Sequence, residues 1–232
     1  MSAGPGLLAQ QSQGNWDWQF ALEILPELLE GLSVTVQATL LGILVAMSVG
    51  LVLAIARRSQ KKWVAWPVGG LVEAVRSTPL LAQLFFLYFV LPDFGIVLSP
   101  MVIGVLGLGI HYACYTSESY RAGIESVPRG QWEAAVALNM SQATRWRRVI
   151  LPQAIPTVIP ALGNYLVAMF KDAPLLSTVT VLELLARARS IQGVTFRGLE
   201  PFTMAGLLFL SVSIPASVLV RFMERRYGYV RA

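Results

Sequence analysis

The stretch from Gly31 to Ala56 reads GLSVTVQATLLGILVAMSVGLVLAIA and contains no charged residue. As an α-helix it would extend about 39 Å at 1.5 Å per residue, and the hydrocarbon core of a bilayer is about 30 Å thick. The stretch therefore predicts a transmembrane helix. Small residues recur every four positions within it, at Gly42, Ala46, Gly50 and Ala54, which predicts close packing against a second helix.

The composition of the whole chain extends this prediction. Of 232 residues 55% are hydrophobic and 13% charged, with a mean hydropathy of +0.61, whereas soluble domains have about 25% charged residues. The net charge of +5 could indicate nucleic acid, but the basic residues fall between apolar runs and are expected to fix topology instead. We therefore expect the lipid bilayer, and no nucleic acid, as a partner.

We predict an all-α polytopic membrane protein with five transmembrane helices, at about 27–56, 63–92, 100–120, 149–170 and 202–220. Residues 1–26 would form an external tail, 27–226 the transmembrane domain, 121–148 a cytoplasmic loop and 227–232 a cytoplasmic tail. The second span carries Glu73 and Arg76, and we expect one long helix bent near Pro79. No cleavable signal peptide is expected, because the first basic residue is Arg57.

The basic residues predict the orientation of these spans. With the amino end outside, thirteen Lys and Arg fall on the cytoplasmic side and four on the opposite side. Cytoplasmic loops carry the excess of positive charge in membrane proteins. We therefore expect the N-terminus outside and the C-terminus in the cytoplasm.

The loop 121–148 holds the most informative pattern. Pro128 suits a helix start, the residues up to Leu138 favour a helix with Trp132, Ala135 and Val136 on one side, and Ser141 can cap a second short helix. Such a bent pair of helices either docks in a groove on another protein or lies on the membrane surface. The residues alone leave both alternatives open.

The same loop resembles the EAA signature of permease subunits in binding-protein-dependent ABC importers. Glu133-Ala134-Ala135, then Asn139, then Val149-Ile150-Leu151-Pro152 match its spacing, with Asn139 in place of Gly and Val149 in place of Ile. Asn tolerates the left-handed conformation better than most residues, so the turn is expected to be preserved. Other elements resemble the polar amino-acid group of these permeases: 73–81, 115–124 and 170–175. Within that group, His111-Tyr112, 118–120 and 196–201 look most like ectoine and hydroxyectoine permeases.

The resemblance implies a transport subunit, not an enzyme. In such importers the loop is a coupling helix that docks on an ATP-binding subunit, and a solute-binding protein delivers the cargo. A second permease, the same or related, would complete the path in the inner membrane. The chain has no G-x-x-x-x-G-K-[ST] phosphate loop, so ATP and Mg are expected on the partner, and this chain is expected to bind no cofactor or metal. The implied coupling residues are Gly130, Glu133, Ala134, Ala135, Leu138 and Asn139.

Polar residues within the spans are candidates for the solute path. His111, Tyr115 and Glu118 share one face of the third span, beside Tyr112, and Lys171 and Asp172 end the fourth. Each has a structural alternative: Glu118 could pair with Arg121 at i+3, and His111 could be a packing residue. The expected cargo is ectoine or hydroxyectoine, with a conventional polar amino acid such as arginine, glutamine or glutamate as the alternative.

Two other classes of protein fit less well. An intramembrane hydrolase needs a nucleophile and base or a set of metal ligands, and the chain has one His, one Cys (Cys114) and no H-E-x-x-H. A purely structural scaffold would not require the loop spacing.

Overall fold

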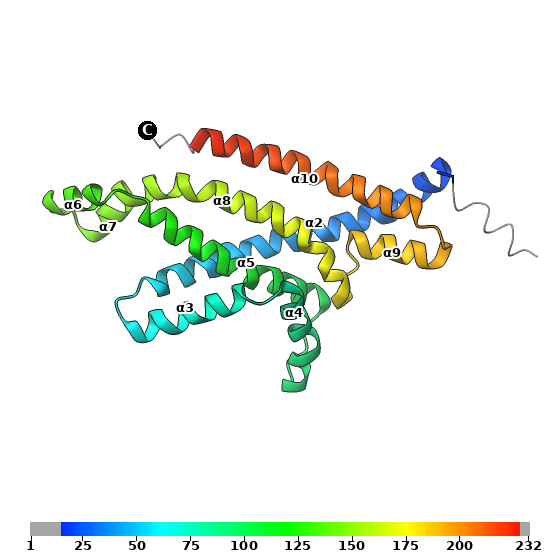
Figure 1. Cartoon of the computed structure of the whole chain (residues 1–232), viewed down its shortest axis with the longest axis horizontal. Coiled ribbons are helices and arrows are strands. Elements are labelled where there is room, and N and C mark those ends of the chain that lie inside the picture. Colours follow the sequence, from blue (N-terminus) through cyan, green and yellow to red (C-terminus); the bar gives the residue numbers. More distant parts are fainter. Residues whose placement is uncertain (1–14, 228–232) are drawn as a thin grey trace, which may run out of the picture.

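The computed structural model describes residues 15–227, and this part of the chain is a bundle of helices without strands (Figure 1). The bounds of its elements are as follows: α2 Trp18–Arg57, α3 Lys62–Arg76, α4 Leu80–Phe85, a π-helical turn Phe86–Val90, a 3-10 turn Leu91–Phe94, α5 Pro100–Glu125, α6 Arg129–Ala137, α7 Gln142–Arg145, a π-helical turn Trp146–Ile150, α8 Leu151–Asp172, a 3-10 helix Ala173–Val179, α9 Leu184–Thr195 and α10 Leu199–Tyr227.

Helices α2 and α5 form the centre of the bundle, and small residues allow their close approach. Ala46, Gly50 and Ala54 are buried on α2, as the four-residue spacing predicted. A Cβ atom on Gly50 would collide with Thr116 Oγ1 on α5. The hydroxyl of Thr116 instead donates a 2.8 Å hydrogen bond to the Ala46 carbonyl. The ladder of small residues is thus a packing feature.

Helix α2 begins nine residues before the predicted start of the first span, so residues 18–26 are not a tail. Asp17 caps the helix by accepting hydrogen bonds from the backbone N–H groups of Gln19 and Phe20. Ala21, Ile24 and Leu28 are buried, and Ile24 and Leu28 pack with residues of α9 and α10. This packing outweighs Pro26, which lies inside the helix. The predicted tail up to residue 14 lies outside the described residues.

The predicted second span is broken rather than bent. Helices α3 and α4 meet at 104°, and the segment Leu80–Phe94 projects sideways from the bundle (Figure 1). Pro79 explains the position of the break, because it has no N–H to continue the hydrogen-bond ladder of α3. The expectation of one long helix over 63–92 was therefore wrong, although the change of direction falls at the predicted residue.

Length and composition alone do not confirm five spans. Among residues 15–227 three helical segments are long and apolar enough to cross a membrane: Trp18–Arg57, Gln142–Val179 and Leu199–Arg226. The broken pair α3 and α4 counts as a fourth if it is one span. Helix α5 has 26 residues but carries His111, Glu118 and Arg121 among its apolar residues. The count of five stays a prediction that depends on α5 and on the broken pair of α3 and α4.

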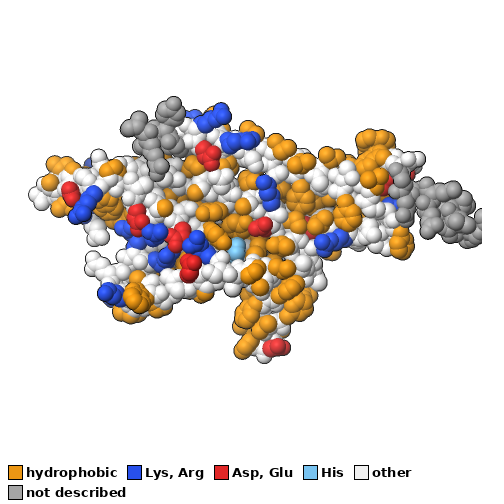
Figure 2. Space-filling view, in the orientation of Figure 1, with side chains coloured by type: hydrophobic (Ala, Val, Ile, Leu, Met, Phe, Trp, Pro, Cys, Tyr) orange, Lys and Arg blue, Asp and Glu red, His pale blue; other side chains and the backbone are white. Residues whose placement is uncertain are grey.

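The elements separate into two ends along the long axis of the molecule. Helices α6 and α7, the start of α3 and the end of α10 lie at one end, and α9 with the starts of α2 and α10 lies at the other (Figure 1). Most of the Lys and Arg visible in Figure 2 lie toward the end that carries α6 and α7. The basic loops predicted to share one side of the membrane therefore do lie together.

A cluster of ionic contacts closes the opposite end. Arg197 donates hydrogen bonds to Asp17 (3.1 Å) and to Glu200 (2.5 Å), and its guanidinium lies 4.4 Å from the centre of the Phe20 ring. The hydrogen bond from the backbone N–H of Phe20 lowers the pKa of Asp17, and the hydrogen bond from Arg197 lowers it further. A lowered pKa means that the ionised form favours the folded state, so the contribution is present above the ordinary pKa of Asp and is lost as pH falls through the lowered value.

Candidate functional site

The first candidate region is the loop that contains α6 and α7. As predicted, Pro128 precedes α6, and Ser141 caps α7 by accepting a hydrogen bond from the Thr144 N–H. Asn139 adopts a left-handed conformation (φ 52°), which is the geometry that Gly provides in the related signature. The two short helices and the turn between them therefore form the bent pair that the sequence indicated.

The two faces of α6 differ. Ala135 is only 3% exposed, and Trp132 on the same side packs edge-on against Trp146, with ring centres 5.4 Å apart. Val136, expected on this side, is instead 52% exposed. The remaining predicted coupling residues are exposed: Gly130, Glu133, Ala134, Leu138 and Asn139. Ala135 therefore packs inside its own chain, and the other five form the accessible surface of the loop.

The second candidate region is a wall of polar and aromatic side chains in the middle of the bundle. On α5 the ring of His111 lies 5.4 Å from that of Tyr112 and 5.2 Å from that of Tyr115. The hydroxyl of Tyr112 donates a 2.7 Å hydrogen bond to Asp172 at the end of α8. The structure thus brings four of the six predicted path residues together. Lys171 is exposed, and its role stays a prediction.

Glu118, the sixth predicted path residue, is the centre of an ionic cluster. Its carboxylate lies 2.6 Å from Arg57, 2.9 Å from Arg121 and 3.5 Å from Arg76. The pairing with Arg121 was the structural alternative for Glu118, and it is confirmed. Arg76 also lies 3.5 Å from Glu73, and its guanidinium sits 5.2 Å from the centre of the Tyr115 ring. The ionic cluster and the aromatic wall are therefore continuous.

Two residues of the wall were missed by sequence reasoning. Tyr165 on α8 packs against Tyr112 and Tyr115, with ring centres 6.1 and 6.0 Å apart. Gln83 on α4 lies 3.3 Å from Nδ1 of His111. Gln83 could have been found, because it is an amide within the uncharged run that follows Arg76 and polar groups at membrane depth need partners. Tyr165 carries no such signal, because tyrosine is common in apolar helices.

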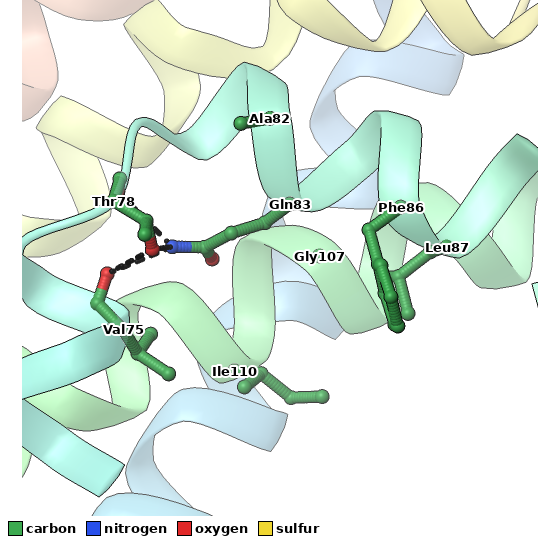
Figure 3. A pocket seen from close by; sticks show the side chains of 8 residues that line it. All are labelled: Val75, Thr78, Ala82, Gln83, Phe86, Leu87, Gly107 and Ile110. Atoms are coloured by element: carbon green, nitrogen blue, oxygen red, sulfur yellow. Dashed lines mark hydrogen bonds between the residues drawn. The ribbon is translucent and has the colours of Figure 1, made fainter. Parts of the chain in front are cut away.

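A pocket of about 420 Å³ opens beside this wall, at the break between α3 and α4. Its lining is mostly apolar and consists of Val75, Thr78, Ala82, Gln83, Phe86, Leu87, Gly107 and Ile110 (Figure 3). Gln83 points toward Thr78 and the carbonyl of Val75 on one side of the pocket (Figure 3). No group of three or more His, Cys, Asp or Glu in residues 15–227 could hold a metal ion.

A helical membrane subunit with an exposed helical loop and a polar wall inside its bundle has the build of a transport permease. The chain belongs to the family of binding-protein-dependent transport system inner membrane components, which matches residues 18–229. It is a permease subunit of an amino-acid ABC importer, a family whose members work with an ATP-binding subunit and a solute-binding protein.

Individual relatives agree with this assignment. The chain is 51% identical over 211 residues to the probable amino-acid ABC transporter permease protein y4tG of Sinorhizobium fredii, covering 91% of each chain. It is 35% identical to the nopaline transport system permease protein NocM of Agrobacterium fabrum, covering 90% of each. A solved structure of an amino acid ABC transporter with histidines superposes with a TM-score of 0.86 at 34% identity, covering 91% of this chain and 99% of that one. These relatives do not support the narrower resemblance to ectoine permeases.

Proposed function

We propose that the chain forms half of the path by which an ATP-driven importer carries a polar amino acid across the inner membrane. The observation that carries this proposal is the continuous wall of His111, Tyr112, Tyr115 and Asp172 inside an apolar bundle. Polar and ionisable groups are costly at membrane depth and mark transport pathways when they face a cavity. A second permease, identical or related, supplies the other half.

The cargo that fits this wall best is a conventional polar amino acid rather than ectoine. The relatives are named for amino acids and, in one case, for nopaline. Glu118 was a candidate for the solute path, but its carboxylate is shared among three arginines. Asp172 and the aromatic rings remain to receive the cationic end of a zwitterion.

ATP hydrolysis reaches this path through the exposed surface of α6. Glu133 on α6 and Leu138, which directly follows the helix, face outward, and Leu138 is 75% exposed. An exposed apolar side chain beside a short helix suits a groove on a partner. Closure of two ATP-binding subunits, which hold ATP and Mg, would move this loop and switch the access of the path. The basic end of the molecule (Figure 2) then lies in the cytoplasm and the N-terminus outside.

Uptake by a reconstituted transporter tests this proposal. The chain is purified with its ATP-binding subunit, placed in proteoliposomes with its solute-binding protein, and supplied with ATP inside. We expect uptake of labelled arginine, glutamine or glutamate to be inhibited by an unlabelled polar amino acid and left unchanged by excess ectoine. Strong inhibition by ectoine would overturn the assignment of a conventional amino acid as cargo. If the chain purified with no ATP-binding subunit, the transport role would be overturned.

A further inference from the structure

Gln83 stands at the break between α3 and α4 and donates a hydrogen bond to the carbonyl of Val75, which also accepts from the backbone N–H and the hydroxyl of Thr78. Pro79 has no N–H to donate to the carbonyl of Val75, which is its i−4 partner. The Gln83 Nε2 group donates there, at 2.8 Å, and also lies 3.1 Å from the Thr78 carbonyl and 2.9 Å from the Thr78 hydroxyl (Figure 3). Non-helical backbone at membrane depth needs partners of this kind.

These contacts fix the orientation of the Gln83 amide. An amide carries its N–H donors on one end and its acceptor oxygen on the other, and its orientation is assigned from the surrounding network. The two carbonyls accept only, so the nitrogen must face the break. Oε1 therefore faces His111, 3.3 Å from Nδ1 of the imidazole.

The orientation of the amide in turn determines the protonation of the ring. Oε1 can only accept a hydrogen bond, so Nδ1 of His111 must carry the proton. In a neutral imidazole the other nitrogen, Nε2, is then unprotonated and accepts hydrogen bonds. His111 is surrounded by the wall residues Tyr112 and Tyr115, so this acceptor belongs to the wall.

We propose that Gln83 is a positioning residue that anchors itself in the α3–α4 break and holds His111 in the Nδ1–H tautomer. The free Nε2 then accepts a hydrogen bond from an N–H donor of the cargo, such as an amino-acid ammonium group. The role in cargo binding rests on the proposed function, whereas the tautomer does not. Gln83 touches no cargo itself and acts through His111.

The tautomer is directly measurable, because His111 is the one histidine among the 232 residues. The full chain is labelled with ¹⁵N-histidine, purified through a tag without histidine, placed in nanodiscs at pH 8 and studied by NMR. We expect a protonated Nδ1 and an unprotonated Nε2. Gln83→Leu should remove this preference. Gln83→Met, which keeps the length of the side chain, should do the same if the leucine variant does not fold.

Thr78→Val is the matched control, because it leaves both carbonyl partners of the Gln83 amide in place and should keep the Nδ1–H tautomer. A wild-type ring protonated at Nε2 would overturn the proposal, and so would an unchanged spectrum in Gln83→Leu. Failure of amino-acid uptake would count against the proposed function alone, since the spectrum is recorded without cargo.

Uptake kinetics in the complete transporter test the cargo contact. Loss of one hydrogen bond of about 1.4 kcal/mol corresponds to about a tenfold change in affinity. We expect the KM for uptake to rise about tenfold in His111→Leu, which removes the acceptor. The rise should be smaller in Gln83→Leu, which keeps the imidazole but removes its tautomer preference, and the double variant should be no worse than His111→Leu, because Gln83 acts only through His111. A role limited to folding would lower the amount of protein and the maximal rate while KM stayed constant, which would overturn the cargo contact.

Discussion

The α6–α7 loop and the polar wall differ in how far apart in the sequence their contacting residues lie. In the loop, Arg129 pairs with Glu133 four residues later, and Ser141 caps the N–H of Thr144 three residues later. In the wall the bonded partners are far apart in sequence: His111 and Gln83 by 28 positions, Tyr112 and Asp172 by 60. A segment shaped by its own neighbours can offer its outer face to a partner, whereas the wall is held together by contacts between α4, α5 and α8.

Substitutions of two adjacent alanines on α6 give the largest expected effect on uptake. They also separate a surface that meets a partner from one that packs within the chain. Ala134 is exposed and Ala135 is 3% exposed. We expect Ala134→Trp to reduce uptake to background while the amount of folded protein in the membrane stays the same, because the bulk obstructs only a partner. Uptake assays with quantitative immunoblots of membranes measure both quantities.

Ala135→Trp is the matched variant and should act in the opposite way. Overpacking a filled core lowers the free energy of unfolding by typically about 1–3 kcal/mol, and by more for a large insertion. The amount of folded protein in the membrane should therefore fall. Normal uptake in Ala134→Trp would remove the docking role of this face. An Ala135→Trp variant with full protein level and no uptake would mean that Ala135 also meets the partner.

In the wall, loss of the Glu118 carboxylate should destabilise the fold rather than the contact with a partner. The side chains of Glu118 and Arg57 are 22% and 19% exposed, and Glu118→Gln would leave Arg57, Arg76 and Arg121 without their shared counter-ion. Breaking such a pair is expected to cost about 3 kcal/mol, visible as a lower Tm in detergent. Glu125→Gln is the control: Glu125 is 52% exposed, so about 1 kcal/mol or less is expected. Equal shifts for both variants would contradict a central role of Glu118.

This difference in sequence separation explains which features of the structure the sequence could predict. The loop was predictable because Pro128, Asn139 and Ser141 act on adjacent residues, and the structure confirms the cap and the left-handed turn. The side of α6 that each residue faces was predicted less well, since Val136 is exposed and Ala135 is inside. The packed side of α6 carries Trp132, whose partner Trp146 lies beyond α7, so the pattern within α6 does not reveal that contact.

The wall was predictable only along a single helix. The spacing of His111, Tyr115 and Glu118 placed them on one face, but nothing local shows that Arg57 reaches Glu118 across 61 positions. The break after α3 is an intermediate case. Pro79 marked its place, but the 104° angle could not be predicted from the local sequence, and α4 also contacts α5, where Leu84 lies against Gly107.

Within the wall, Tyr112→Phe tests a single long-range bond. The hydroxyl of Tyr112 donates to Asp172 at 2.7 Å, and the residue is 6% exposed. A hydrogen bond to a charged group contributes about 1.5 kcal/mol, and we expect this loss in thermal stability together with a change in the KM for uptake. Tyr115→Phe serves as the comparison, because it keeps the aromatic ring, which makes the contacts of Tyr115 with the ring of His111 and with the guanidinium of Arg76. If Tyr115→Phe proved the more costly variant, the bond to Asp172 would not be what holds the end of α8 to α5.

In the loop, Asn139→Gly should have the smallest effect, and its sign is informative. Asn139 has φ 52°, and a left-handed conformation costs a residue with a side chain about 1 kcal/mol relative to Gly, which adopts it freely. Because Gly also gains entropy in the unfolded chain, the net change should lie within about 0.5 kcal/mol of zero. Asn139→Val, which tolerates this conformation poorly, should instead lower stability by about 1–2 kcal/mol. Both are measured as shifts in Tm, with uptake assayed in parallel. A clear loss of uptake in Asn139→Gly at unchanged Tm would show that the exposed side chain of Asn139 itself contacts the partner, so that the loop would contribute a specific side chain at its turn as well as an outward face on α6.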